Sequence, residues 1–151
     1  MVRPATPSDI HAMIELLRRL FAIEADFDFS AERQRRGLEL LLATPTAMVT
    51  AAEEDGKVVG MATAQLVIST AEGGPSLLIE DLVVLPSHQG KGIGGSLLTA
   101  LAEWGAGMGA DRMQLLADRT NISALDFYRK KGWQETQLLC LRNYSNKEIL
   151  Q

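Results

Sequence analysis

A glycine-rich turn in the second half of the chain has the composition of a phosphate-binding site. It reads Gln89-Gly90-Lys91-Gly92-Ile93-Gly94-Gly95 and lies between an apolar segment and an amphipathic one. Glycines let the backbone approach an anion closely, and the free N–H groups and the dipole of a helix start attract negative charge. A glycine-rich helix start also loses helix propensity, so a plain tight turn is the weaker interpretation. We therefore predict an anion cradle, to which Lys91 adds a positive side chain.

Three glycines of this turn also match the dinucleotide-binding pattern G-x-G-x-x-G: Gly90, Gly92 and Gly95. A dinucleotide fold is opposed by the late position of the turn, after which few elements follow, and by residues 86–89, which separate the glycines from the preceding strand. Asp118, the acidic residue after the next strand, comes late for a ribose partner. A P-loop is excluded because glycine follows Lys91. A small dinucleotide-binding protein is kept as one alternative function.

Apolar periodicity and turn residues predict one mixed α/β domain in the order β-α-α-β-β-β-α-β-α-β. The strands are expected at residues 2–5, 47–53, 58–69, 77–85, 113–117 and 133–141, and the helices at residues 6–21, 30–42, 92–108 and 121–131. Thr6-Pro7-Ser8-Asp9 is typical of a helix start, and the pair Asp55-Gly56 is typical of a hairpin turn. The length of 151 residues fits a single domain, residues 1–151, in which residues 143–151 form a polar tail.

The glycine-rich turn resembles the pyrophosphate motif Q/R-x-x-G-x-G/A of the GNAT family of N-acetyltransferases. Gln89 stands where many members carry arginine, which removes one charge from the site. Ile79-Glu80-Asp81-Leu82-Val83-Val84 is similar to a strand of the diamine and small-molecule amine acetyltransferases of that family. The resemblance implies a mostly antiparallel central sheet flanked by helices, with acetyl-CoA as acetyl donor. It also implies that the backbone of residues 82–84 pairs with the pantetheine arm, while residues 89–95 hold the pyrophosphate.

Glu80 is the predicted general base. Acetyl transfer from a thioester needs a neutral amine, so a base must remove a proton, directly or through water. Glu80 interrupts an apolar strand beside the expected cofactor site, where partial burial would raise its pKa, and the family's amine acetyltransferases often carry glutamate there. A carboxylate that only solvates the strand is the alternative. Asp81 is expected on the other face of the strand, in a structural role or in contact with the acceptor.

Tyr128 is the predicted general acid that protonates the departing thiolate. Residues 121–132 resemble the family segment N-x-x-A-x-x-F-Y-x-x-x-G-F, with Trp133 in place of its last phenylalanine. In that segment the tyrosine hydroxyl lies near the thioester sulfur, and the asparagine, here Asn121, contacts the pantetheine arm. Asn121 is also a favourable helix N-cap. An amphipathic packing role is the alternative for Tyr128.

Three acidic residues between the first two helices form the expected wall of the acceptor site: Glu24, Asp26 and Asp28. By the resemblance this region contacts the acceptor, and its charge suits a cationic amine, although a solvated acidic loop is an equal alternative. We expect a primary amine of a small molecule that attacks directly in a ternary complex. The alternatives are a non-catalytic acyl-CoA-binding or sensing module of the same fold and a protein N-terminal or lysine acetyltransferase.

Composition gives the expected cellular setting. The net charge of −4 opposes nucleic acid as a partner. A leader and a membrane-spanning run are not recognisable, so a cytoplasmic protein is expected without membrane contact. His and Cys residues do not stand at metal-ligand spacing, so a metal is not expected, and Cys140 is predicted as a small apolar residue of the last strand. Because dimers are frequent in the family, a homodimer is a further possibility.

Overall fold

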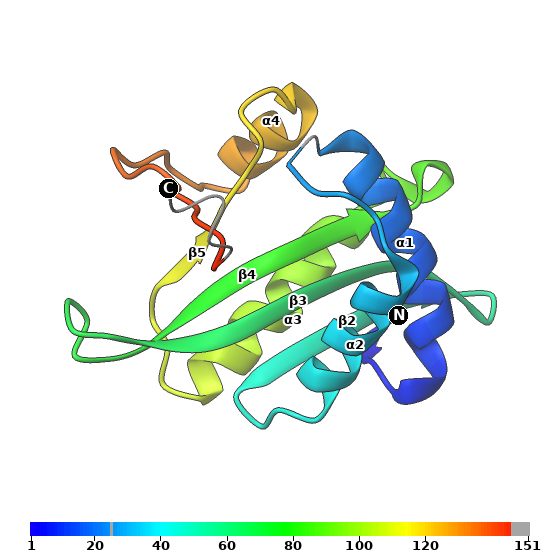
Figure 1. Cartoon of the computed structure of the whole chain (residues 1–151), viewed down its shortest axis with the longest axis horizontal. Coiled ribbons are helices and arrows are strands. Elements are labelled where there is room, and N and C mark those ends of the chain that lie inside the picture. Colours follow the sequence, from blue (N-terminus) through cyan, green and yellow to red (C-terminus); the bar gives the residue numbers. More distant parts are fainter. Residues whose placement is uncertain (25, 146–151) are drawn as a thin grey trace.

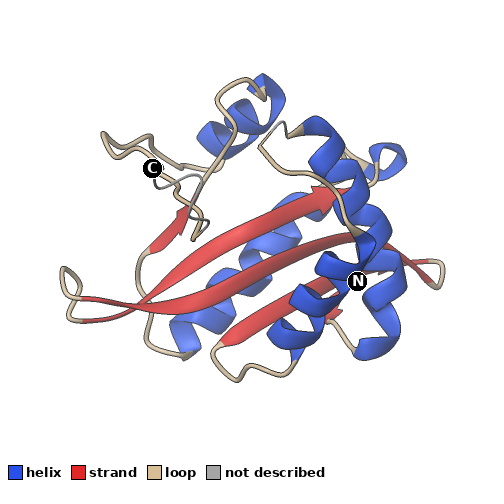
Figure 2. Cartoon of the chain, in the orientation of Figure 1, coloured by secondary structure: helices blue, strands red, loops and turns tan. Residues whose placement is uncertain are grey.

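A five-stranded sheet separates two layers of helices (Figures 1 and 2). The computed structural model describes residues 1–24 and 26–145. The strands are β1 Val2–Pro4, β2 Ala47–Glu54, β3 Lys57–Ser69, β4 Gly74–Val84 and β5 Met113–Leu115. The helices are α1 Ile10–Ile23, α2 Ala31–Leu42, α3 Ile93–Gly107 and α4 Ile122–Lys130, with short 3-10 turns at η1 Pro7–Asp9 and η2 Pro86–His88. Within the described residues, no helix is both long and apolar enough to cross a membrane.

The strands follow their order in the chain from β1 to β5. The first four are antiparallel neighbours, and β5 pairs with β4 in parallel. The β2–β3 hairpin turns at Asp55 and Gly56, whose φ angles of 50° and 76° are those of a type I′ turn. Such a turn matches the twist of the strands and fixes their register. The mixed sheet with helices on both faces confirms the predicted fold class.

Each face of the sheet has its own apolar core. On one face, α1 and α2 pack through residues such as Met13, Leu17 and Leu38 against Met61 and Val83. The core on the other face lies under α3 and consists of ten buried residues: Ala52, Val59, Ala62, Ala64, Leu77, Ile79, Leu97, Leu98, Leu101 and Ala110. The sheet therefore has an α1/α2 side and an α3 side, names that are kept below.

The predicted last strand at residues 133–141 is wrong, because the described residues after α4 contain no strand. Leu138, Leu139 and Leu141 are exposed by 77%, 74% and 91%, and Cys140 is exposed instead of buried in a core. A strand needs hydrogen bonds from a neighbour, and four consecutive apolar residues lack the alternation that places one strand face on a core. The polar tail predicted at residues 143–151 lies outside the described residues from residue 146 onwards.

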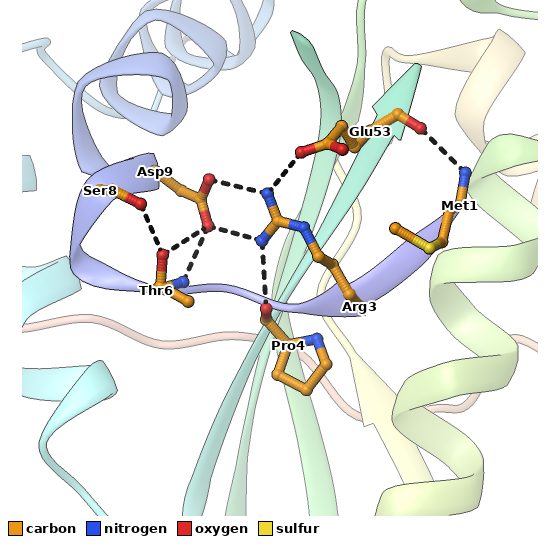
Figure 3. A network of polar contacts seen from close by, with 7 residues as sticks. All are labelled: Met1, Arg3, Pro4, Thr6, Ser8, Asp9 and Glu53. Carbon is orange, nitrogen blue, oxygen red and sulfur yellow. Dashed lines mark hydrogen bonds and ion pairs between the residues drawn. The ribbon is translucent and has the colours of Figure 1, made fainter. Parts of the chain in front are cut away.

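The start of the chain is held by a polar network around Arg3 (Figure 3). The guanidinium group donates two hydrogen bonds to Asp9, at 2.8 and 3.0 Å, and one of 2.9 Å to Glu53 on β2. Asp9 also accepts a hydrogen bond from the backbone N–H of Thr6 at 2.8 Å. Thr6 is thus the N-cap of the first helical turn, as the sequence predicts. Asp9 is only 6% exposed. The network thus joins β1, β2 and the start of α1.

Replacement of Arg3 by alanine is expected to lower the free energy of unfolding by about 2 kcal/mol, because a buried carboxylate loses its charged partner. The hydrogen bond from Arg3 holds the pKa of Asp9 below its ordinary 3.8. This contribution is therefore fully present above pH 3.8 and fades as pH falls through the lower folded value. Urea unfolding at neutral and acidic pH checks both points. Arg33→Ala, at an exposed position of α2, is the control, with an expected change within about 0.5 kcal/mol; equal losses for both variants would contradict the prediction.

Candidate functional site

The glycine-rich turn has the backbone geometry of an anion cradle. Gly90 and Gly92 have φ angles of 78° and 82°, a left-handed conformation that other residues rarely adopt. A Cβ atom added at either glycine would meet nothing within 4 Å, so the space in front of the backbone is open. The first helical hydrogen bond of α3 runs from Ser96 N to Gly92 O at 3.0 Å, and the N–H groups of residues 93–95 precede it. These groups have no partner within the helix and can bind an anion.

Two side chains lie at this turn. The Gln89 amide donates to the carbonyl of Val84 at 3.1 Å and ties the turn to the end of β4. The Lys131 ammonium lies over the first turn of α3, since a Cβ atom added at Gly95 would be 2.9 Å from its Nζ atom. An open groove of ≈ 640 Å³ along α3 is lined by Lys131 together with Gly92 and Gly95. Lys131 brings positive charge to the predicted phosphate site, and the sequence analysis missed it.

The second half of β4 extends beyond its neighbour β5. The parallel pairing joins Leu77, Leu78 and Ile79 to residues 113–115 and ends there, whereas β4 continues to Val84. Among the described residues, the segment 82–84 therefore has a strand partner only on the β3 side. An extended ligand can add to a sheet edge of this kind through backbone hydrogen bonds. The predicted pantetheine-binding residues Leu82, Val83 and Val84 lie in this segment.

A β-bulge in β4 decides how Glu80 and Asp81 are placed. Thr63 pairs with Asp81 and Ala64 pairs with Ile79, so Glu80 is the extra residue of β4. The bulge interrupts the alternation of side chains. Ile79 belongs to the α3 side, and after the bulge Val83 belongs to the α1/α2 side, two residues beyond Asp81. Asp81 is therefore placed on the face that α1 and α2 cover.

The predicted partial burial of Glu80 is wrong, because this residue is exposed. Asp81 is the less exposed of the two: it is half-buried, and its pKa is raised to about 6. Burial is the main cause, the hydrogen bond from Thr63 acts in the opposite direction, and the negative charge of Glu80 raises the pKa further. An extra residue in a bulge turns away from the regular packing, which explains why burial falls on the following residue.

Glu24 lies within electrostatic reach of Asp81. It ends α1, and its backbone N–H donates to Leu20 O. Its pKa is raised, first by burial and then by the negative charges of Asp81, Asp118 and Asp26. Asp26 itself is exposed and pairs with Arg142 at 3.6 Å, and Asp28 is exposed. The structure thus brings Glu24 and Asp81 together from distant parts of the chain, and it adds Asp118, which was not predicted for this site.

Tyr128 is placed by the short helix α4. Asn121 caps this helix by accepting a hydrogen bond from Ala124 N at 3.2 Å, as predicted. The Tyr128 ring packs edge-on against Phe127 and Trp133, with ring centroids 5.3 and 5.8 Å apart. Burial, and then the negative charge of Glu24, raise its pKa to about 12. The hydroxyl therefore stays protonated at neutral pH and can act as a proton donor.

The helices α3 and α4 meet closely at Gly94. A Cβ atom added there would lie 3.3 Å from the Phe127 ring, tighter than most real contacts. The glycine therefore allows α4 to approach the first turn of α3. As a result, Tyr128 and the glycine-rich turn belong to one packed unit on the α3 side. Carboxylates and a protonated tyrosine can take part in proton transfer, and an anion cradle can bind a phosphate-bearing ligand.

Comparison with known proteins agrees with this chemistry. The aminoglycoside N(6')-acetyltransferase type 1 of Stenotrophomonas maltophilia is 28% identical over 139 residues, which cover 90% of this chain and 87% of the relative. The aminoalkylphosphonate N-acetyltransferase of Salmonella typhimurium is 27% identical over 135 residues, covering 89% and 85%. The chain spans 66%, 40% and 22% of the length of three further relatives, each named as an acetyltransferase.

A solved structure shares the fold at lower identity. The aminoglycoside N-acetyltransferase AAC(6')-Iy, in complex with CoA, superposes with a TM-score of 0.84 at 19% identity, over 97% of this chain and 95% of that one. In addition, a family model described as the acetyltransferase (GNAT) family matches residues 10–133, which are most of the chain. The protein thus belongs to the GNAT family of acetyltransferases.

Proposed function

We propose that this protein transfers an acetyl group from acetyl-CoA to a primary amine of a small molecule. The observation that carries the proposal is the arrangement along residues 80–95, where carboxylates, an unpaired strand edge and a phosphate cradle follow one another. The names of relatives, which are acetyltransferases of aminoglycosides and of aminoalkylphosphonates, support an amine acceptor. Acetyl-CoA supplies the acetyl thioester, which the acceptor amine attacks directly in a ternary complex.

Residues of β4 and α3 would hold the donor. The N–H groups at the start of α3, with Gly90 and Gly92 in left-handed conformation, fit its pyrophosphate. Gln89 keeps this turn against β4, Lys131 adds positive charge at Gly95, and the exposed Lys91 adds a second positive charge within the turn. The backbone of Leu82, Val83 and Val84 offers the hydrogen bonds for the pantetheine arm, and Asn121 lies at the start of α4 for a further contact. The residues present therefore fit acetyl-CoA.

Glu80 and Tyr128 are the proposed proton-transfer groups. Glu80 accepts the proton of the attacking amine, and its exposure favours transfer through a water molecule. Tyr128 donates its proton to the sulfur of the leaving group. Its hydroxyl is protonated at neutral pH, and its raised pKa makes it a weaker acid than an ordinary tyrosine. Glu24 and Asp81, with Asp26 nearer the surface, attract the acceptor. Their mutual repulsion is relieved when a cation binds, which supports a cationic amine as the acceptor.

Thermal unfolding with acetyl-CoA, CoA, NAD and NADH tests the donor. A ligand at about 100 times its dissociation constant is expected to stabilise the fold by roughly 2.7 kcal/mol, which raises the midpoint by about 5 to 10 °C. We expect this shift with acetyl-CoA and CoA alone. A shift with NAD or NADH only would overturn the proposal. Binding without turnover of any amine in a broad panel would favour the acyl-CoA-sensing alternative.

Two glycine variants make this test specific. Gly92→Ala places a methyl group in the cradle and strains a left-handed residue, whereas Gly73→Ala strains a residue of similar φ, 71°, next to the opposite end of β4. Both variants are expected to lose about 1 to 2 kcal/mol of stability. Only Gly92→Ala is expected to weaken CoA binding, by about tenfold. Equal CoA affinities in the two variants would contradict a cradle at Gly92.

A homodimer in the cytoplasm is also proposed. The exposed apolar run at residues 138–141 supports a contact between two copies, since such runs are unfavourable in water. A free, exposed Cys140 and the use of acetyl-CoA support a reducing compartment. Sedimentation is expected to show a dimer that weakens in the double variant Leu138→Ser, Leu141→Ser. A monomeric wild type would refute the dimer.

A further inference from the structure

Thr63 and Asp81 form a reciprocal hydrogen-bonded pair at the bulge. The Thr63 hydroxyl donates to Asp81 Oδ2 at 2.7 Å. The backbone N–H of Asp81 donates to the same hydroxyl oxygen at 3.2 Å. Thr63 is 1% exposed and lies directly opposite Asp81 in the register of β3 and β4. Because the hydroxyl oxygen accepts from the Asp81 amide, its hydrogen is directed to the carboxyl group.

The hydrogen bond from Thr63 favours the charged form of Asp81, whereas the other surroundings of Asp81 favour its neutral form. Burial and the charge of Glu80, on the same strand, favour the neutral acid. Glu24, at the end of α1, is a further carboxyl near Asp81, and the negative charges of Asp81 and Asp118 raise its pKa. Tyr128, on α4, is held protonated. The hydrogen bond from Thr63 is the interaction that stabilises the Asp81 carboxylate.

We infer that Thr63 is a positioning residue that decides acceptor specificity: it holds Asp81 as a carboxylate, which binds a protonated amino group of the acceptor. The attacking amine must be neutral, whereas the group at Asp81 must be charged. The acceptor class is therefore a molecule with two amino groups, one that is acetylated and one that stays protonated. This inference rests on the proposed function for the nature of the ligand, but the state of Asp81 can be measured without turnover.

The direct test is an NMR pH titration of the Asp81 carboxyl carbon, assigned with Asp81→Asn. Thr63→Val removes the donor and is expected to raise the midpoint by about one pH unit. Thr63→Ser keeps the hydroxyl and is expected to restore a midpoint close to that of the wild type. Circular dichroism and the CoA-induced thermal shift show that the variants are folded. Equal midpoints in the wild type and Thr63→Val would overturn the inference.

Kinetics with a matched pair of amines test the specificity. 1,4-Diaminobutane carries the second amino group, and 1-aminobutane lacks it. At a pH below the midpoint of the variant, Thr63→Val is expected to raise KM for the diamine by up to about tenfold, the factor that one pKa unit gives. The KM of acetyl-CoA is expected to stay unchanged, and the KM for 1-aminobutane is expected to rise less than that for the diamine. Equal effects on both amines would overturn the assignment of specificity.

The two proposals can fail separately. If the wild type acetylates neither amine, the proposed function fails for these acceptors. The titration is then repeated with 1,4-diaminobutane alone. A lowered Asp81 midpoint in the wild type, with a smaller change in Thr63→Val, supports the inference because a bound cation favours the carboxylate. A midpoint that the diamine leaves unchanged overturns it.

Discussion

Tyr128→Phe is expected to lower kcat by about 10²-fold, the lower end of the range for loss of a general acid. The variant keeps the ring, which packs between Phe127 and Trp133, and removes only the hydroxyl. Acetyl-CoA binding is therefore expected to be unchanged, so the loss should appear in kcat and not in KM. Steady-state kinetics with a saturating donor give this result directly.

The matched control is Tyr144→Phe, because Tyr144 is 55% exposed. Its kcat is expected to equal that of the wild type. If Tyr128→Phe also retains the wild-type kcat, the hydroxyl is not the proton donor and Tyr128 serves packing alone.

Glu80→Gln is expected to lower kcat by about 10²-fold as well, because the glutamine side chain cannot accept a proton from the amine. Asp81→Asn is expected to act differently, by raising KM for the acceptor while kcat falls less. The two variants remove one negative charge each from neighbouring residues of the bulge, so charge alone does not distinguish them. The pH dependence of kcat in each variant shows which carboxyl titrates with the reaction.

An exposed glutamate on α2 provides the control for Glu80. Glu39→Gln removes the same charge away from the sheet and is expected to leave the kinetics unchanged. If Asp81→Asn loses kcat and Glu80→Gln does not, the base is Asp81, and the assignment of Glu80 is wrong.

The sequence predicted most of what positions the site because the decisive signals are local. The glycines at 90 and 92, the cap at Asn121 and the turn at Asp55-Gly56 each act within a few residues. A glycine in left-handed conformation needs no distant partner, so its position in the sequence is informative by itself. The fold class followed from the same local elements and their order.

The details that the sequence missed depend on partners far away in the chain. The burial of Asp81 in place of Glu80 follows from the register of β3 against β4, which shifts between Thr63 and Ala64. The last strand failed because residues 133–141 have strand-like composition, but the described residues offer them no paired neighbour. Lys131 reaches Gly95 only because α4 packs on α3. Each of these features depends on tertiary contacts, which the pattern of residues within one strand does not predict.

The two apolar cores lie on opposite faces of the sheet, and this separation affects how the acceptor specificity can change by mutation. Thr63 and Asp81 stand on the face where α1 and α2 pack, whereas the cradle and α4 belong to the face where α3 packs. Leu85 packs against both clusters, so substitutions in different clusters act almost additively on stability where they do not contact Leu85. A library confined to α1, α2 and their facing residues can therefore explore new acceptors while the donor half keeps its shape. The sheet separates most of the acceptor half from the donor half, while Leu85 and the charge of Glu24 near Tyr128 connect the two.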